Sequence, residues 1–171
     1  SAFGTNIYTI QNGSINPSSE GYISLGGGVT LNLNASVDGA AHKFYTLANA
    51  SVLNIGAGVS QTSSSSRFAV YGGTPSTASV NMNAADYADD GIWLIGSPIS
   101  GTTSTSKAGQ NLTVNINADQ STTSLILVGW TTTGNENKIV VRNGASLTNS
   151  SQIRLGINGS SVAIGTGRLV I

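Results

Sequence analysis

Short stretches in which apolar and polar residues alternate recur along the whole chain. The clearest lies at 112–118 and reads Leu-Thr-Val-Asn-Ile-Asn-Ala, and the stretches at 29–35, 52–57 and 80–84 are close copies of it. Strict alternation is the side-chain period of a β-strand with one buried face. Each copy ends in Asn or Gly followed by Ala, which are small residues suited to a turn. The pattern predicts a series of similar strands, called the asparagine strands below.

A second strand type, ending mostly on glycine, precedes most of the asparagine strands. Its copies lie at 23–26, 45–48, 69–72, 93–96, 126–129 and 153–156. They recur about every 22 to 27 residues with one longer step, which is the spacing of a solenoid repeat. Two strands per repeat, with a short third strand or bend, predict an all-β parallel β-helix of about six to seven coils. An antiparallel β-sandwich is the alternative, because its strands recur at similar intervals.

The alternation assigns the two faces of the asparagine strands. Their apolar residues are predicted to point inward and to stack from coil to coil, while the Asn and Thr residues point outward. The outer face is interpreted as an uncharged, solubilising surface whose side-chain amides bond along the stack. A polar platform for a glycan and an ice-binding face are the alternatives. The inward residues are Leu31, Leu33, Leu53, Ile55, Val80, Met82, Val114 and Ile116.

The glycine-ended strands are apolar on both sides, which is typical of strands that are covered on both sides. One side is predicted to enter the core. The other forms an apolar stripe that either the loops at 61–66 and 97–110 or another molecule covers. Trp130 follows one of these strands and is a surface candidate for stacking on a sugar ring. The stripe is represented by Phe44, Phe68, Ile92 and Leu125.

Composition narrows the classes of function. The chain is 39% hydrophobic and 8% charged, with a formal net charge of +0. That balance gives no electrostatic footprint for nucleic acid, so no nucleic-acid partner is expected. There are 0 cysteines, which excludes disulfides and thiolate metal sites. No apolar run approaches the ~20 residues of a membrane helix, so membrane insertion is not expected. A chain rich in Ser, Thr, Asn and Gly favours an extracellular location.

Catalytic and metal-binding patterns are weak. His42 is the one histidine, so a Ser-His-Asp arrangement is not supported. The acidic cluster of Asp86, Asp89 and Asp90 is a candidate calcium site, although aspartates near Gly are also common turn formers. The carboxylates are spread along the chain and no facing pair is singled out. We therefore expect no enzyme activity and no cofactor, apart from calcium as an option.

Two stretches carry a resemblance to a known family. Residues 31–37 read Leu-Asn-Leu-Asn-Ala-Ser-Val and residues 143–147 read Asn-Gly-Ala-Ser-Leu. They resemble the repeats of pectate-lyase-like adhesive domains on the surfaces of lactobacilli and related Gram-positive bacteria. The resemblance covers most of the chain as a style of repeat, and it offers no catalytic residues to transfer. It implies a right-handed parallel β-helix at the cell surface that adheres without catalysis.

The sequence thus leads to three hypotheses of function for residues 1–171, taken as a single domain. The first is a cell-surface module that adheres to host or matrix glycans or proteins. The second is a structural module that assembles with copies of itself, as surface-layer (S-layer) proteins of lactobacilli do. The third is a polysaccharide lyase or hydrolase. Because the chain stops on the apolar residues Leu169, Val170 and Ile171, we also expect it to be part of a longer surface protein.

Overall fold

The chain folds as a parallel β-solenoid, as the sequence predicts. Every regular element within the part of the chain that the structure describes is a β-strand, and all strand pairs are parallel. The computed structural model describes residues 6–15, 21–38, 43–62, 67–72, 77–88, 91–96, 111–129, 136–142, 144–156 and 166–171.

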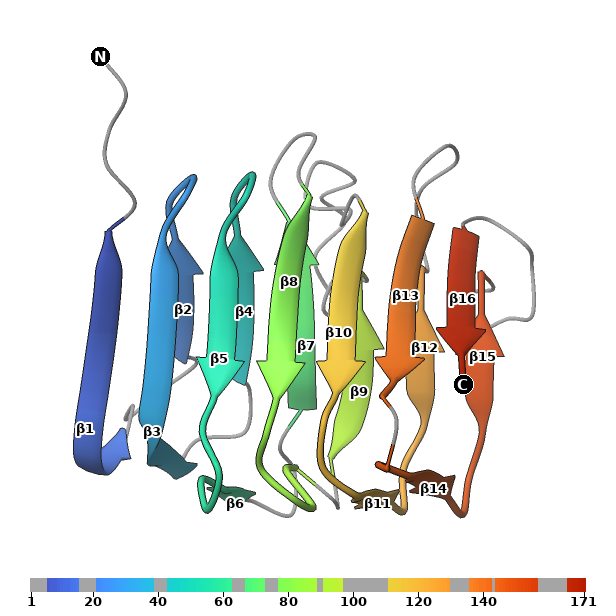
Figure 1. The fold of residues 1–171 in the computed structure, drawn as a ribbon. Helices are drawn as coiled ribbons and strands as arrows, with labels where there is room; N and C mark the ends of the chain where they lie inside the picture. Colours follow the sequence, from blue (N-terminus) through green and yellow to red (C-terminus); the bar gives the residue numbers. More distant parts are fainter. Residues whose placement is uncertain are drawn as a thin grey trace.

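Two sheets face each other across the interior. The front sheet of Figure 1 contains the asparagine strands in chain order, and the short β6 pairs with the end of β3 beside it. Its strands are β1 (Ile7–Ile15), β3 (Thr30–Asp38), β5 (Val52–Ile55), β6 (Gln61–Thr62), β8 (Ala78–Met82), β10 (Leu112–Ile116), β13 (Glu136–Val141) and β16 (Thr166–Val170).

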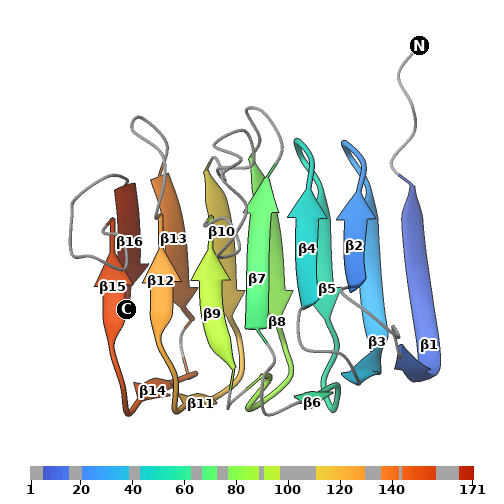
Figure 2. The ribbon, with the colours of Figure 1, turned by 180° about the vertical axis from the view of Figure 1, so that it is seen from behind.

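The rear sheet contains the glycine-ended strands, also in chain order. Figure 2 shows it from behind, with its arrows pointing against those of the front sheet. The chain descends the front sheet, crosses the bottom, ascends the rear sheet and advances to the right in Figure 1, which makes the coil right-handed. Its strands are β2 (Gly21–Leu25), β4 (Lys43–Leu47), β7 (Arg67–Gly72), β9 (Ile92–Ile95), β12 (Ile126–Val128) and β15 (Ile153–Leu155).

A third, short side closes some of the coils. It contains the paired strands β11 (Gln120–Thr122) and β14 (Leu147–Asn149), together with β6 and the ends of β1 and β3. Strand β1 bends onto this side at a bulge where Asn12 and Gly13 have φ of 59° and 94°, a conformation that Asn and Gly adopt most readily. Within the described residues, strands of the third side are present at some turns only, and the number of turns is somewhat lower than the six to seven predicted.

The interior is built from stacked apolar side chains. Leu33 pairs with Ile55, Ile55 with Met82, and Met82 with Ile116, and all four side chains are fully buried. These residues form the single column that the alternating pattern predicts. Each such side chain stabilises the fold by about 1.5–3 kcal/mol through removal from water. Because the contact is between like side chains on successive coils, one short sequence pattern suffices to build the whole core.

The register of β7 corrects one sequence expectation. Aligning the strands on their closing glycines placed Phe68 in the outer stripe, but Phe68 pairs with Lys43 and Trp93 and lies in the interior. The ladder matches Gly72 with Leu47 and not with Ala48. A shift of one residue moves every side chain of a strand to the opposite face. Phe68 therefore belongs to the core and not to the outer stripe.

An aromatic cluster fills the interior beside β7. The Phe68 ring lies 5.7 Å from Tyr87 and 5.1 Å from Trp93, centroid to centroid, in edge-to-face geometry. Tyr87 enters from the turn at 84–88, and its hydroxyl lies 2.8 Å from that of Tyr45. Burial raises the pKa of Tyr45 to about 12 and the pKa of Tyr87 well above its usual value. Each hydroxyl therefore has a hydrogen-bond partner in the other, as buried tyrosine hydroxyls usually require.

The outer side of the rear sheet carries a small apolar cluster. Ala69, Leu94 and Leu127 are buried there, and Ile92 and Leu125 pack against them while partly exposed. Ala69, Leu94 and Leu127 are buried in this way within a single chain. The centre of the predicted stripe is thus covered by the chain itself, without a second molecule.

Candidate functional site: the amide ladder and its groove

The outer face of the front sheet carries a continuous row of asparagine side chains. The parallel register places Asn32, Asn54, Asn81 and Asn115 side by side on β3, β5, β8 and β10. Each side-chain amide nitrogen donates to the side-chain oxygen of the preceding coil. The Nδ2–Oδ1 distances are 2.8 Å from Asn54 to Asn32, 2.8 Å from Asn81 to Asn54, and 2.9 Å from Asn115 to Asn81. We call this row the amide ladder.

Both ends of the amide ladder are also bonded. At the N-terminal end, Asn32 Nδ2 donates to the Thr9 hydroxyl over 3.3 Å. At the C-terminal end, the Arg142 guanidinium donates to Asn115 Oδ1. All five bonds therefore run in one direction, from Arg142 toward Thr9. Aligned hydrogen bonds polarise one another. The positive charge of Arg142 beside the Asn115 oxygen favours this direction.

A second amide row runs beside the ladder. Asn117 Nδ2 donates to Asn83 Oδ1 over 2.9 Å. In an earlier coil the side chain of Asn34 lies over Gly56, where a Cβ atom would collide with the Asn34 Oδ1. A side chain at position 56 would therefore require the Asn34 amide to shift. The outer face is thus crowded with amide groups on two adjacent rows.

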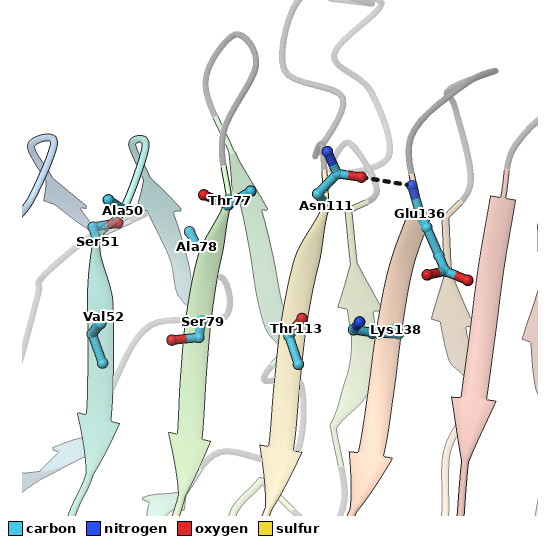
Figure 3. Close-up of a pocket in the computed structure, with 10 residues that line it drawn as sticks. All are labelled: Ala50, Ser51, Val52, Thr77, Ala78, Ser79, Asn111, Thr113, Glu136 and Lys138. Atoms are coloured by element: carbon cyan, nitrogen blue, oxygen red, sulfur yellow. Dashed lines mark hydrogen bonds between the residues drawn. The ribbon is translucent and has the colours of Figure 1, made fainter.

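A shallow groove of about 470 Å³ runs across four strands on the other side of the amide ladder (Figure 3). It lies along the solenoid axis, so its length is roughly three strand spacings, or about 14 Å. Small residues form its floor, and its C-terminal end holds one acidic and one basic residue. The lining residues are Ala50, Ser51, Val52, Thr77, Ala78, Ser79, Asn111, Thr113, Glu136 and Lys138.

Local hydrogen bonds hold the walls of the groove. Asn111 Oδ1 accepts the backbone N–H of Glu136 over 3.0 Å, as drawn in Figure 3. At the other end, the Ser51 hydroxyl donates to the Ala48 carbonyl over 2.7 Å. Thr77 contributes its backbone N–H and its hydroxyl to Asn49 Oδ1, at 3.1 and 3.2 Å. The groove is therefore a fixed feature of the turns that lead into the front sheet.

Among the residues that line the groove, the charged ones lie at its C-terminal end. Lys138 follows Thr113 in the strand register, and Arg168 follows Lys138. Arg168 contacts Glu136 at 3.4 Å in an exposed ion pair, which contributes little to stability. Glu136 is the one carboxylate among the residues that line the groove. A facing carboxylate pair, as glycosidases need, is not formed by these lining residues.

The structure places the sequence-predicted site residues in different environments. Ile92 and Leu125 pack in the apolar cluster on the outer side of the rear sheet, whereas the groove lies on the front sheet. Phe68 is in the core. Strand β4 includes Phe44, but its side chain lies outside the described part of the structure, as do Trp130, Asp89 and Asp90.

Asp86 has the structural role of a turn former. Its Oδ1 accepts the backbone N–H of Ser121 over 2.9 Å, and Asp119 repeats the arrangement with Ser146 over 2.8 Å. These bonds tie one coil to the next on the third side. Within the described ranges, no group of three or more His, Cys, Asp or Glu residues is placed to hold a metal ion.

The groove was not anticipated from the sequence. Its lining residues come from four strands and are small or of mixed polarity, so no local motif marks them. The stacked amides were anticipated, because Asn recurs at the same position of each asparagine strand. The bond between Arg142 and the amide ladder was missed, because Arg142 lies just after β13 and its partner is set by the side-chain conformation.

Comparison with protein-family models, curated protein sequences and solved structures found no match to this chain. Among the described residues, no helix is long and apolar enough to cross a membrane.

Proposed function

We propose that this chain is a non-catalytic adhesion module of a bacterial cell surface that binds an extended glycan along the solenoid axis. The amide ladder and the adjacent groove form the binding face. The observation that carries the proposal is the unbroken ladder lying beside a groove of the same direction. The charge-poor composition and the resemblance of the repeats to surface adhesive domains support the extracellular location.

The amide ladder keeps hydrogen-bonding capacity for a ligand. An Asn side chain has two N–H donors and two oxygen lone pairs. The ladder uses one donor and one acceptor of each internal Asn, so one of each remains per coil. These remaining groups repeat every ~4.8 Å along the axis, which is close to the length of one pyranose unit in an extended polysaccharide. Successive sugar hydroxyls would therefore meet equivalent amides.

The groove adds shape to this polar row. Its volume of about 470 Å³ is within the range of small-ligand sites. Val52 and Ala78 give the groove apolar surface, while Ser79 and Thr113 supply hydroxyls. A shallow site of this kind, whose charged lining residues Glu136 and Lys138 lie at one end, suits weak binding of a long chain, in which many equivalent contacts add up. Affinity is thus expected to grow with the length of the oligosaccharide.

Filling the groove tests the proposal. Ser79→Leu places an apolar side chain at the centre of the groove, and Thr148→Leu places the same side chain on the exposed third side. We expect a glycan array to identify a β-linked oligosaccharide that binds the unaltered chain. Titration calorimetry with the hexasaccharide of that sugar and linkage should show at least a tenfold loss of affinity for Ser79→Leu and none for Thr148→Leu. Equal binding by both variants, or no glycan binding at all, would reject the proposal.

Self-assembly is a second candidate function, because the first strand of the front sheet exposes two large apolar side chains. Ile7 is 67% exposed and Tyr8 is 55% exposed on β1, which among the described strands pairs only with β3. Open strand edges of this kind can pair with another chain. Light scattering should then show concentration-dependent association that Tyr8→Lys abolishes. A chain that stays monomeric at every concentration would exclude this candidate.

A further inference from the structure

The amide ladder has a direction, and we propose that Arg142 is the positioning residue that sets it. Arg142 donates to Asn115, and the donation then passes through Asn81 and Asn54 to Asn32 without a reversal. The direction decides which side of each Asn presents its free N–H and which presents its free oxygen. It therefore determines in which order a bound ligand meets donors and acceptors along the face.

The amides themselves do not prefer one direction. Oxygen and NH₂ are nearly the same size, so rotating a side-chain amide by half a turn preserves its shape. If every ladder residue rotated together, each pair would again have one N–H facing one oxygen. Rotating a single Asn alone would break the bonds on both of its sides. The ladder consequently has two self-consistent directions, and the groups at its ends select between them.

The two ends differ in their ability to select. The Thr9 hydroxyl can donate or accept, so it suits either direction of the ladder. The Arg142 guanidinium has only donors, so it suits only the direction in which Asn115 presents its oxygen. In the reversed ladder, the Asn115 NH₂ would face the guanidinium and a charge-assisted bond would be lost. Asn115 is 8% exposed, so water replaces that bond poorly.

The direction has a consequence for binding that rests on the proposed function. A polysaccharide is itself directional, because its two ends differ. A ladder with one fixed direction offers donors and acceptors in one order along the axis. An extended glycan should therefore lie on this face with its reducing end toward one end of the solenoid only. Arg142 would thereby determine ligand orientation without being part of the groove.

The direction can be read by NMR of the side-chain amides, without any ligand. In the unaltered chain, Asn115 Nδ2 protons should show contacts to Asn81, and Asn32 Nδ2 protons should show contacts to Thr9. Arg142→Glu replaces the donor by an acceptor, so both sets of contacts should switch. Asn115 protons should then contact Glu at position 142, and Asn32 protons should contact Asn54. Arg142→Gln can act as donor or acceptor, and it should give a mixture of the two directions.

Backbone spectra of the variants provide the folding control, because Arg142 is exposed and follows β13. A switch confined to Asn115 in Arg142→Glu would overturn the proposal, since the ladder would not act as one unit. An unchanged direction in Arg142→Gln would also overturn it, because the direction would then be set elsewhere.

Ligand orientation is tested separately, with a cellohexaose or chitohexaose that carries a nitroxide at its reducing end. We expect paramagnetic broadening at one end of the ladder in the unaltered chain and at the other end in Arg142→Glu. Broadening at both ends in the unaltered chain would reject the orientation inference while leaving glycan binding intact. If neither oligosaccharide binds and the array shows no glycan, the proposed function fails, whereas the amide contacts still decide the role of Arg142.

Discussion

The inner and outer columns of the front sheet run along the same strands but obey different rules. The inner column uses Leu33, Ile55, Met82 and Ile116 and then continues with Val141 in the same register. The outer column is Asn on four successive strands and then becomes Val140. Burial of apolar surface has no direction, so residues of different shape can follow each other. Side-chain hydrogen bonds require a matching partner at each step.

The comparison indicates what each column contributes. The inner column holds the coil together, because each of its members removes a large apolar side chain from water. The outer column contributes less to stability, because water can replace the amide bonds of its partly exposed members Asn32, Asn54 and Asn81. Its regularity is therefore better explained by a surface property, which the proposed glycan binding supplies.

The largest effect should follow from opening the inner column. Ile55→Ala removes a fully buried side chain between Leu33 and Met82 and leaves a cavity. We expect the free energy of unfolding to fall by about 2–5 kcal/mol, as for other large-to-small core changes. Urea denaturation followed by circular dichroism measures it. A loss below about 1 kcal/mol would mean that the column is not the main support of the fold.

The next largest effect should come from alkaline pH, through the buried tyrosine pair. In the folded chain the pKa of Tyr45 is raised to about 12 from an ordinary value of 10.0, because burial disfavours the phenolate. The unfolded chain therefore loses this proton first, and stability falls as pH rises from about 10 to about 12. Each pKa unit corresponds to about 1.4 kcal/mol, so Tyr45 alone accounts for roughly 2–3 kcal/mol.

Denaturation at a series of alkaline pH values, with phenolate absorbance as a second signal, measures this loss. The double variant Tyr45→Phe with Tyr87→Phe removes both hydroxyls of the pair and is the matched control. Its unfolding free energy should be less sensitive to pH in this range. If both proteins lose stability equally, other groups titrate and the pair is not the cause.

The sequence predicted the inner column better than the outer face. Alternation alone identified Leu33 and Ile55 as neighbours, because every asparagine strand has the same period. It failed for Phe68, since the closing glycines are not at equivalent positions in the ladder and one residue of shift reverses the faces. The groove depends on which residues of four strands lie side by side, and only the pairing register determines this. The direction of the amide ladder, which we propose that Arg142 sets, could not be predicted from the repeats, because the corresponding position of β3, β5, β8 and β10 is Asn or Gly.

The smallest effect on stability should follow from interrupting the amide ladder. Asn81→Leu removes the acceptor of Asn115 and the donor to Asn54, so two inter-coil bonds are lost. Asn83→Leu is the control, because it removes one such bond, from Asn117. Each exposed or partly exposed bond is worth about 0.5–1.5 kcal/mol, so the first variant should lose about twice as much as the second.

Glycan affinity should respond more strongly than stability to Asn81→Leu, because the change breaks the repeat of donors and acceptors at its centre. Titration with the same hexasaccharide, beside urea denaturation, separates the two effects. A variant that loses stability but binds as well as the unaltered chain would show that the outer column is structural, like the inner one. The difference between the columns would then lie only in solubility, and the binding face would have to be sought elsewhere on the solenoid.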